Sequence, residues 1–365
     1  MKSARHYVAV TGKGVWMEKQ QIIDWLRTDD EARLEDLWRR ADETRRANVG
    51  DEVHLRGLLE ISNICARDCH YCGLRAGNSG LERYRMPEDE IMECVHEAVG
   101  YRYGTVVLQA GEDHGIRKEW VSGLVRRIKS ETELAVTLSL GERTEDEYRE
   151  WKEAGADRYL LRFETSSREL YERIHPPVAG SASDRIETLR LLKRMGYEAG
   201  SGVMIGIPGQ TYDDLAEDIM LFRTLDLDMI GVGPYIPHHE TPLGRSDELL
   251  SAPEGRQVPN TEEMTYKVIA LARLVCPSAN IPSTTALATL NTNSGRELGL
   301  SRGANIVMPN MTPRKYRSMY EIYPAKACID ETAADCRSCM HRRILSIGRT
   351  VGSGRGDSPN RKNAA

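Results

Sequence analysis

Six of the eight cysteines in this sequence lie in two short clusters, and their thiols are the side chains best suited to chemistry. The first cluster consists of Cys65, Cys69 and Cys72, with the spacing C-x3-C-x2-C. The second consists of Cys328, Cys336 and Cys339, with the spacing C-x7-C-x2-C. The first residues contain no apolar secretory segment, so we expect a cytoplasmic chain with reduced cysteines. Clustered thiols in such a chain indicate metal ligands rather than disulfides.

The first cluster offers three thiolates within eight residues, and the number three is informative. A structural zinc site takes four ligands, and an iron–sulfur cluster that only carries electrons is usually held by four cysteines. A [4Fe–4S] cluster held by three cysteines leaves one iron open to bind a substrate or cofactor. The alternative is a zinc site completed by His70 or by a remote residue.

The elements that must position these clusters alternate in type along the chain. Residues 17–49 predict two charged amphipathic helices, so residues 1–53 are expected to form an N-terminal helical extension. Between residues 54 and 310, eight short apolar runs alternate with charged helical stretches, which is typical of a complete (β/α)8 TIM barrel. The runner-up, an open doubly wound sheet, lacks a G-x-G-x-x-G after its first strand. The first cysteine cluster directly follows the first apolar run and should therefore lie at the carboxyl mouth of the barrel.

The rest of the chain and its composition narrow the function further. Residues 311–349 form a C-terminal segment with the second cysteine cluster, and residues 350–365 are poor in apolar side chains and expected to be disordered. The Arg355-Gly356-Asp357 tripeptide in this tail is interpreted as a chance match to an adhesion motif. The net charge is −5, and no apolar run approaches the roughly 20 residues of a membrane span. We therefore expect neither nucleic acid nor a membrane as a partner.

The run CARDCHYCGLR resembles the cysteine motif of the radical S-adenosylmethionine (SAM) superfamily. In that superfamily the open iron of a [4Fe–4S] cluster binds the amino and carboxylate groups of SAM, and one electron cleaves SAM to a 5′-deoxyadenosyl radical. The resemblance implies that the first cysteine cluster holds this iron–sulfur cluster, with Tyr71 near the adenine. Ala110-Gly111-Glu112 stands where the superfamily has a Gly-Gly-Glu element that meets the SAM ammonium, and Ala110 makes this match partial.

The fourth apolar run, DRYLLRFET, carries two arginines on one strand face. These are Arg158 and Arg162, and Glu164 follows at the end of the run. Buried arginines are costly unless they are paired, so an anionic ligand is their expected partner. The alternative is an internal salt bridge to Glu112 or Glu164.

Longer runs resemble the HydE family of [FeFe]-hydrogenase maturases within this superfamily. The matching runs include CHYCGLRAGN, VVLQAGED, EWKEAGADRYLLRFET, GIPGQTYDDL, IGVGPYIPHHETPL and GANIVMPNMTP, in order from about residue 54 to 340. Biotin synthase and methylornithine synthase share the cysteine spacing but resemble the sequence less between the motifs. One departure is Phe163, where the family pattern RHET has histidine.

The family resemblance implies roles for three further sets of residues. Those implied to bind SAM are Tyr71, Gly111, Glu112, Arg162, Glu164 and Arg185. Those implied to bind substrate inside the barrel are Gln109, Thr137, Ser139, Thr284, Thr285 and Tyr323. Those implied to act in catalysis are Arg158, Met308 and Tyr320. Arg158 is expected to counter the charge of an anionic substrate.

HydE-like enzymes are understood to act on a small organometallic iron–cysteinate complex that carries CO and cyanide and is made by HydG. Their product enters the diiron subcluster assembled on HydF, and ferredoxin or flavodoxin is the expected electron donor. Such radical chemistry needs a closed cavity that excludes water. The alternatives are a mutase or synthase of the biotin synthase or methylornithine synthase type acting on a small amino-acid-like substrate, a HydE paralogue with another substrate, and a non-catalytic iron–sulfur or zinc scaffold.

The second cysteine cluster predicts a second iron–sulfur site, of either [2Fe–2S] or [4Fe–4S] type. Unliganded thiols are the alternative, because seven residues between cysteines is a loose spacing. His341 is a candidate fourth ligand, but a place on a helix face or in solvent is favoured. His238 and His239 are interpreted as loop or substrate-contact residues rather than as a metal pair.

Overall fold

The structure is a computed structural model that describes residues 16–178, 183–245 and 250–362. The strands are β1 (Glu52–Ser62), β2 (Thr105–Ala110), β3 (Ala135–Ser139), β4 (Arg158–Leu160), β5 (Glu198–Ser201), β6 (Met204–Ile205), β7 (Met229–Ile230), β8 (Gly233–Pro234), β9 (Ile306–Val307) and β10 (Thr350–Val351). The helices up to the middle of the chain are α1 (Lys19–Arg27), α2 (Glu31–Val49), α3 (Glu88–Gly100), α4 (Lys118–Glu131), α5 (Glu145–Glu153), α6 (Arg168–Ile174), α7 (Arg185–Arg194) and α8 (Tyr212–Thr224). The later helices are α9 (Pro242–Arg245), α10 (Glu262–Val275), α11 (Thr285–Leu290), α12 (Gly295–Ser301), α13 (Arg314–Arg317), α14 (Ala333–Ser346) and α15 (Pro359–Lys362).

Most strands form one curled parallel sheet, as expected for an α/β fold. Neighbouring strands follow the order β10-β1-β2-β3-β4-β5-β7, β9 also pairs with β1, and β6 and β8 form a separate pair. In the register, Glu60 of β1 lies opposite Gln109 of β2, which lies opposite Ser139 of β3. Because opposite residues in a parallel sheet face the same side, these three side chains share one level near the carboxyl ends of their strands.

The uninterrupted ladder covers only part of a barrel, whereas the sequence predicted a complete eight-stranded one. Between β7 and β9 the chain makes single parallel bridges, Met229 with Asn280 and Pro282 with Ile306. Pro282 has no backbone N–H to donate, so this apolar run does not extend into a regular ladder strand. The sheet is therefore a partial barrel with a loosely bridged side.

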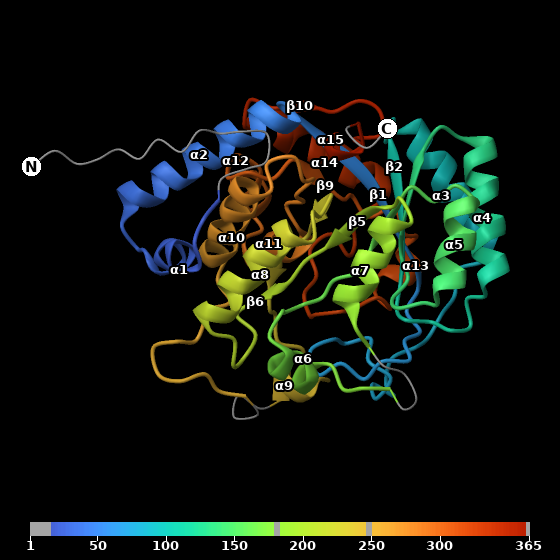
Figure 1. Cartoon of the computed structure of the whole chain (residues 1–365). Helices are drawn as coiled ribbons and strands as arrows, with labels where there is room; N and C mark the ends of the chain where they lie inside the picture. Colours follow the sequence, from blue (N-terminus) through green and yellow to red (C-terminus); the bar gives the residue numbers. More distant parts are fainter. Residues whose placement is uncertain (1–15, 179–182, 246–249, 363–365) are drawn as a thin grey trace, which may run out of the picture.

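The predicted helices of residues 17–49 form α1 and α2, which lie on the outside of the barrel (Figure 1). The helix α2 packs against α10, and α1 packs against α8 and α10. As a result, α10 is buried along residues Met264 to Val275, although it belongs to the outer layer of helices. No helix within the described ranges is long and apolar enough to cross a membrane.

The prediction of a disordered tail is wrong for its described part. Thr350 and Val351 form β10, which extends the sheet in parallel beside Glu52 and Val53 of β1. Residues 352–358 then cross the amino-terminal end of the barrel, and Figure 1 shows β10 and α15 at the end of the molecule opposite α6 and α9. We call residues 350–358 the C-terminal strap. Hydrogen bonds hold it rather than apolar burial, which is why its low apolar content was misleading.

The C-terminal strap also accounts for Arg158. This arginine begins β4 and is 1% exposed; it pairs with Glu198 at 2.7 Å and with Asp357 of the strap at 2.5 Å. Arg355 of the same tripeptide pairs with Asp157. The tripeptide interpreted as a chance match therefore belongs to the base of the barrel. The charge of Arg158 is already matched there, away from the mouth, which contradicts the expectation that it counters the charge of a substrate.

Candidate active site

The first cysteine cluster lies in the loop that follows β1 at the carboxyl end of the sheet. Cys69 is buried, and Cys65 and Cys72 are half-buried. Burial raises the pKa of all three thiols, that of Cys72 to about 12, and the neighbouring cysteines raise the pKa of Cys69 and Cys72 further. Thiols in this environment stay protonated unless a cation binds them, so three of them in one short loop are suited to a metal centre.

The end of β2 packs directly on this loop, and Gly111 makes the contact possible. A Cβ atom on Gly111 would lie 2.3 Å from the carbonyl oxygen of Ile64 and 2.9 Å from Cβ of Cys65. The next backbone amide, that of Glu112, donates a hydrogen bond to Cys65 Sγ at 3.4 Å. Hydrogen bonds to sulfur tune iron–sulfur clusters, and they favour the thiolate form of a ligand. The donor set therefore fits a [4Fe–4S] cluster held by three cysteines.

A buried chain of ion pairs runs beside the cysteine loop. Glu112 pairs with Arg67 at 2.6 Å, Arg67 with Glu142 at 3.0 Å, and Glu142 with Arg185 at 2.9 Å. Arg185 Nη2 also donates to His175 Nε2 at 2.7 Å. Glu112 and Arg185 were expected near SAM, and the structure brings them to the cysteine loop. Arg67 and Glu142 were missed because their partners come from distant segments and leave no local pattern. His175, ten residues before Arg185, was missed as well.

The carboxyl end of β4 contributes Arg162 and Glu164. The two side chains form an ion pair at 3.2 Å, which is the internal salt bridge weighed as an alternative for this arginine. Arg185 Nη1 donates to the carbonyl of Arg162 at 2.8 Å and so ties β4 to the ion-pair chain. Glu164 has φ = 64°, in the left-handed region that residues with side chains rarely adopt. Backbone strain of this kind costs about 1–3 kcal/mol and clusters at functional sites.

Three buried nitrogen donors near these residues have no hydrogen-bond partner in the described part of the chain. They are Arg67 Nη1, Arg162 Nε and His175 Nδ1. Buried polar atoms are nearly always satisfied, so unpaired donors indicate a ligand with acceptor atoms. The carboxylate of an amino-acid moiety, such as that of SAM, is a ligand of this kind.

Aromatic residues flank the same region in two different ways. Tyr71 packs against a small apolar cluster that includes Leu170, Met204 and Tyr235, a surface suited to a flat aromatic ring. Phe163, which departs from the family pattern, is 1% exposed, and its ring centre lies 5.8 Å from that of Phe222 on α8. Phe163 therefore packs in the core between β4 and α8, and the departure leaves the polar site residues in place.

The residues expected to bind substrate fall into two groups. On the strands, Gln109 Nε2 donates to the Tyr320 hydroxyl at 3.1 Å, and Thr137 has a buried hydroxyl without a partner among the described residues. Tyr323 is half-buried, and burial raises its pKa. The hydroxyl of Thr284 is also buried and unpaired in the described chain, whereas Ser139 is half-buried.

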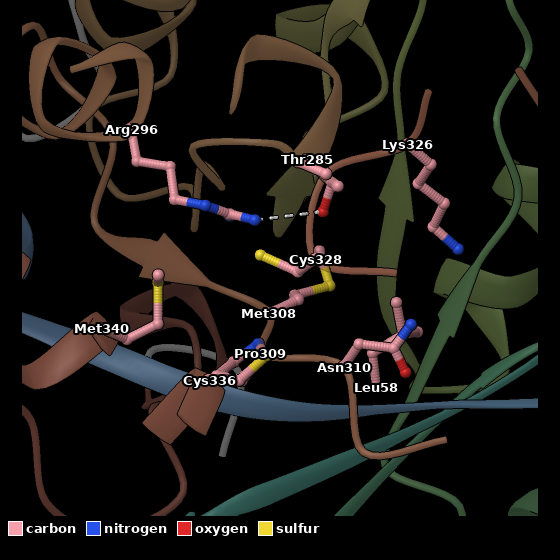
Figure 2. A pocket seen from close by; sticks show the side chains of 11 residues that line it. Leu58, Thr285, Arg296, Met308, Pro309, Asn310, Lys326, Cys328, Cys336 and Met340 are labelled. Atoms are coloured by element: carbon pink, nitrogen blue, oxygen red, sulfur yellow. Dashed lines mark hydrogen bonds between the residues drawn. The ribbon is translucent and has the colours of Figure 1, made fainter. Parts of the chain in front are cut away.

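The other group lines a narrow cavity between the barrel and the C-terminal segment (Figure 2). Thr285 and Met308 lie there, and Arg296 Nη2 reaches the Thr285 hydroxyl at 3.5 Å. Lys326 also lines the cavity and pairs with the buried carboxylate of Glu60. Arg296, Lys326 and Glu60 were not among the predicted residues. A charged residue inside the apolar run HLRGLLEIS was the signal that could have identified Glu60.

The second cysteine cluster borders this cavity. Cys328 and Cys336 lie side by side there, and a hydrogen bond between them lowers the pKa of Cys328 and raises that of Cys336. Cys339 instead accepts a hydrogen bond from Arg343 Nε at 3.4 Å. Two of the three predicted ligands are thus brought together. Across the described ranges, no three Cys, His, Asp or Glu side chains already surround a point that could hold a single metal ion.

Comparison with known proteins defines the class and then the family. Residues 59–222 match the Radical SAM superfamily, and together with the three-cysteine loop at the mouth of the curled parallel sheet they identify a radical SAM enzyme. The chain is 44% identical over 334 residues to the [FeFe] hydrogenase maturase subunit HydE of Thermotoga maritima, covering 92% of each protein. The chain therefore belongs to the HydE family.

Other relatives are more distant. The chain is 29% identical to the 3-methylornithine synthase of Methanosarcina acetivorans, over 81% of this chain and 80% of that protein. The crystal structure of methylornithine synthase (PylB) superposes with a TM-score of 0.76 at 25% identity, covering 93% of this chain and 95% of the other. HydG from Carboxydothermus hydrogenoformans superposes with a TM-score of 0.70 at 18% identity over 92% of this chain and 81% of the other, which indicates a shared fold.

Proposed function

We propose that this protein is a HydE-type maturase that cleaves SAM and uses the resulting radical on a small iron–cysteinate complex carrying CO and cyanide. The observation that carries the proposal is the loop of three buried or half-buried thiols held against Gly111, in a chain 44% identical to HydE over 92% of its length. The substrate follows from this family membership.

Within this proposal, Cys65, Cys69 and Cys72 hold the [4Fe–4S] cluster. The cluster, when bound, supplies one electron that cleaves the SAM sulfonium to methionine and a 5′-deoxyadenosyl radical. Arg162 Nε and His175 Nδ1, both buried and unpaired in the described chain, donate to the carboxylate of SAM. The carboxylates of Glu112 and Glu164 accept from its ammonium, and the apolar surface around Tyr71 receives the adenine.

The substrate lies, in this proposal, inside the partial barrel. The single bridges beside β9 close one side, and the C-terminal strap closes the base, so that water does not quench the radical. Gln109 and the unpaired hydroxyl of Thr137 face the substrate from the strands, and Tyr320 faces it from the chain after α13. Met308 and Thr285 contact it from the side of the narrow cavity.

The proposal extends to the second cysteine cluster and to partners. Cys328, Cys336 and Cys339 hold a second iron–sulfur cluster, for which Cys339 must turn away from Arg343. Ferredoxin or flavodoxin supplies electrons, HydG supplies the substrate, and HydF receives the product, all in the cytoplasm.

The test compares Cys69→Ala with Cys94→Ala, a matched control because Cys94 is also buried but lies alone on α3. After anaerobic reconstitution, Cys69→Ala should lose the iron bound by the first cluster and form no 5′-deoxyadenosine from SAM, and Cys94→Ala should retain both. Cleavage of SAM by the Cys69→Ala variant would contradict the proposal. The substrate is tested by adding the wild-type protein, with HydG and HydF, to apo-hydrogenase and measuring hydrogen evolution.

A second candidate function is a radical rearrangement of a free amino acid, favoured by the superposition on methylornithine synthase with a TM-score of 0.76. It predicts consumption of a free amino acid together with SAM, measured by mass spectrometry over a set of candidate amino acids. The maturase predicts no such product.

A further inference from the structure

A buried carboxylate lies beneath the strained turn at Glu164. Asp218 of α8 is 0% exposed, and its Oδ1 accepts hydrogen bonds from the backbone N–H and the hydroxyl of Ser166, at 2.5 and 2.6 Å. Its Oδ2 faces Gln210 Nε2 at 3.4 Å. The charged groups recorded around Asp218 are Asp214 and Glu217 on the same helix, and burial raises its pKa to about 7.

The partners of Asp218 hold the Glu164 turn from both sides. Ser166 follows Glu164 by two residues, so fixing its N–H and hydroxyl fixes the chain that leaves the turn. On the other side, Gln210 Nε2 donates to the carbonyl of Met204 at 3.1 Å, and Met204 N donates to the carbonyl of Glu164 at 3.2 Å. Asp218 therefore connects α8 both to the chain that leaves Glu164 and to the segment that hydrogen-bonds to the Glu164 carbonyl.

The contacts of Asp218 suit the oxygens of a carboxyl group better than an amide. All three polar groups that face Asp218 are donors, two to one oxygen and one to the other. An asparagine at this position would place its NH2 group opposite one of these donors, either those of Ser166 or that of Gln210. Asp218 has no ion-pair partner within the described ranges, and a buried carboxylate of this kind is an expensive way to stabilise a core, which indicates that the position of the turn is what the residue provides.

We propose that Asp218 is a positioning residue for SAM, which acts by holding Ser166 and thereby aims the strained Glu164 carboxylate at the cofactor. The inference rests on the assignment of Glu164 to the SAM site under the proposed function.

The experiment measures SAM binding to the reconstituted holoprotein by equilibrium dialysis. Asp218→Asn should raise the Kd for SAM about tenfold, the loss expected from one or two misdirected hydrogen bonds, with turnover at saturating SAM within about twofold of wild type. Ser166→Ala should raise the Kd about threefold, and adding it to Asp218→Asn should weaken binding little further, because both act through the same contact.

Asp157→Asn is the matched control. Asp157 is a buried carboxylate that directly precedes β4, the strand that leads to Glu164, and it accepts a hydrogen bond from Val136 N at 2.9 Å. This variant should lower the melting temperature and leave the Kd for SAM unchanged.

Unchanged SAM affinity in Asp218→Asn, or equal weakening in Asp157→Asn, would overturn the inference. If Asp218→Asn does not fold, unchanged affinity in Ser166→Ala overturns it as well. Wild-type protein that binds no SAM would instead refute the proposed function. The wild-type measurement therefore distinguishes a failure of the proposed function from a failure of this inference.

Discussion

His175 is a histidine that the fold keeps neutral. It is 2% exposed, its ring stacks on Tyr171 at 4.8 Å, and its Nε2 accepts from Arg185, which can only donate. Burial lowers its pKa to about 2, and the positive charges of Arg185 and Arg67 add to this effect. The unpaired Nδ1–H is therefore the proton that the ring presents to its surroundings.

This environment predicts a loss of stability in acid. The folded pKa lies below the unfolded value of about 6.5, so the unfolded chain takes up the proton and the free energy of unfolding falls as the pH drops below 6.5. His175→Gln keeps an acceptor for Arg185 but does not titrate. Between pH 7 and 5 the wild type should lose about 2 kcal/mol more than the variant, measured by urea unfolding of the apoprotein. A difference that does not change with pH would contradict this prediction.

At the scale of single residues, the sequence was informative where partners are close along the chain. The three thiols of the first cluster lie on one loop, so their spacing alone predicted a shared centre. The contacts of Asp218 and Arg158 join segments that are far apart, and no local pattern encodes them. For Arg158, strand alternation correctly predicted an inward side chain but not which end of the barrel it occupies.

At the scale of elements, the segment between α13 and α14 is fastened to the first strand by one buried ion pair. Lys326 is 7% exposed and Glu60 is 1% exposed; they pair, and Asn310 Nδ2 donates to the second Glu60 oxygen at 3.1 Å. The ammonium also lies 5.2 Å from the ring centre of Tyr320. This segment thus carries both a predicted catalytic tyrosine and Cys328 of the second cysteine cluster.

The variant Lys326→Met tests whether the ion pair with Glu60 stabilises the fold. Removal of the ammonium leaves the Glu60 carboxylate buried without its cationic partner Lys326. This should lower the free energy of unfolding by about 3 kcal/mol. The double variant Lys326→Met with Glu60→Gln should recover most of the loss, because the glutamine is neutral and still accepts from Asn310. Guanidinium unfolding measures both. A single variant as stable as wild type, or a double variant no better than the single one, would show that the pair does not hold the segment.

The elements also show why parts of the fold were predictable. Strands β1, β2 and β3 are buried on both faces, so their apolar runs stand out between charged helices. The run around Pro282 was counted as a strand on the same evidence, but proline limits it to single bridges. The strand β10 has two residues and exists because β1 is available beside it, which is a long-range pairing without a local signature.

At the scale of the whole molecule, the C-terminal strap joins four parts of the barrel base. Thr105 and Arg158 donate to the carbonyl of Arg355, and Arg56 and Asn280 donate to the carbonyl of Gly356. The strap passes so close to the chain before β2 that a Cβ on Gly104 would lie 1.6 Å from the carbonyl oxygen of Gly354. The strap is therefore part of the packed base.

Deletion of residues 350–365 should lower the melting temperature by about 5 °C or more, because Arg56 and Arg158 lose buried partners. Hydrogen exchange should speed up at the amino-terminal ends of β1, β2 and β4. Deletion of residues 359–365 alone retains the strap and serves as the control, with little change expected in either measurement. Exchange rates at these strand ends that stay at the wild-type level in the longer deletion would contradict the claim that the C-terminal strap protects the amino-terminal end of the barrel from solvent.

The pairing of β10 with β1 also bears on how the molecule is made. Glu52 leaves the ribosome about 300 residues before Thr350, an interval of about 15–60 s at ordinary rates of synthesis. At the end of that interval the nascent protein has most of its helices, but the amino-terminal end of the barrel is still open, and Arg56, Arg158 and the edge of β1 face the solvent there. The barrel can therefore exclude water at this end only after residues 350–358 have been synthesised.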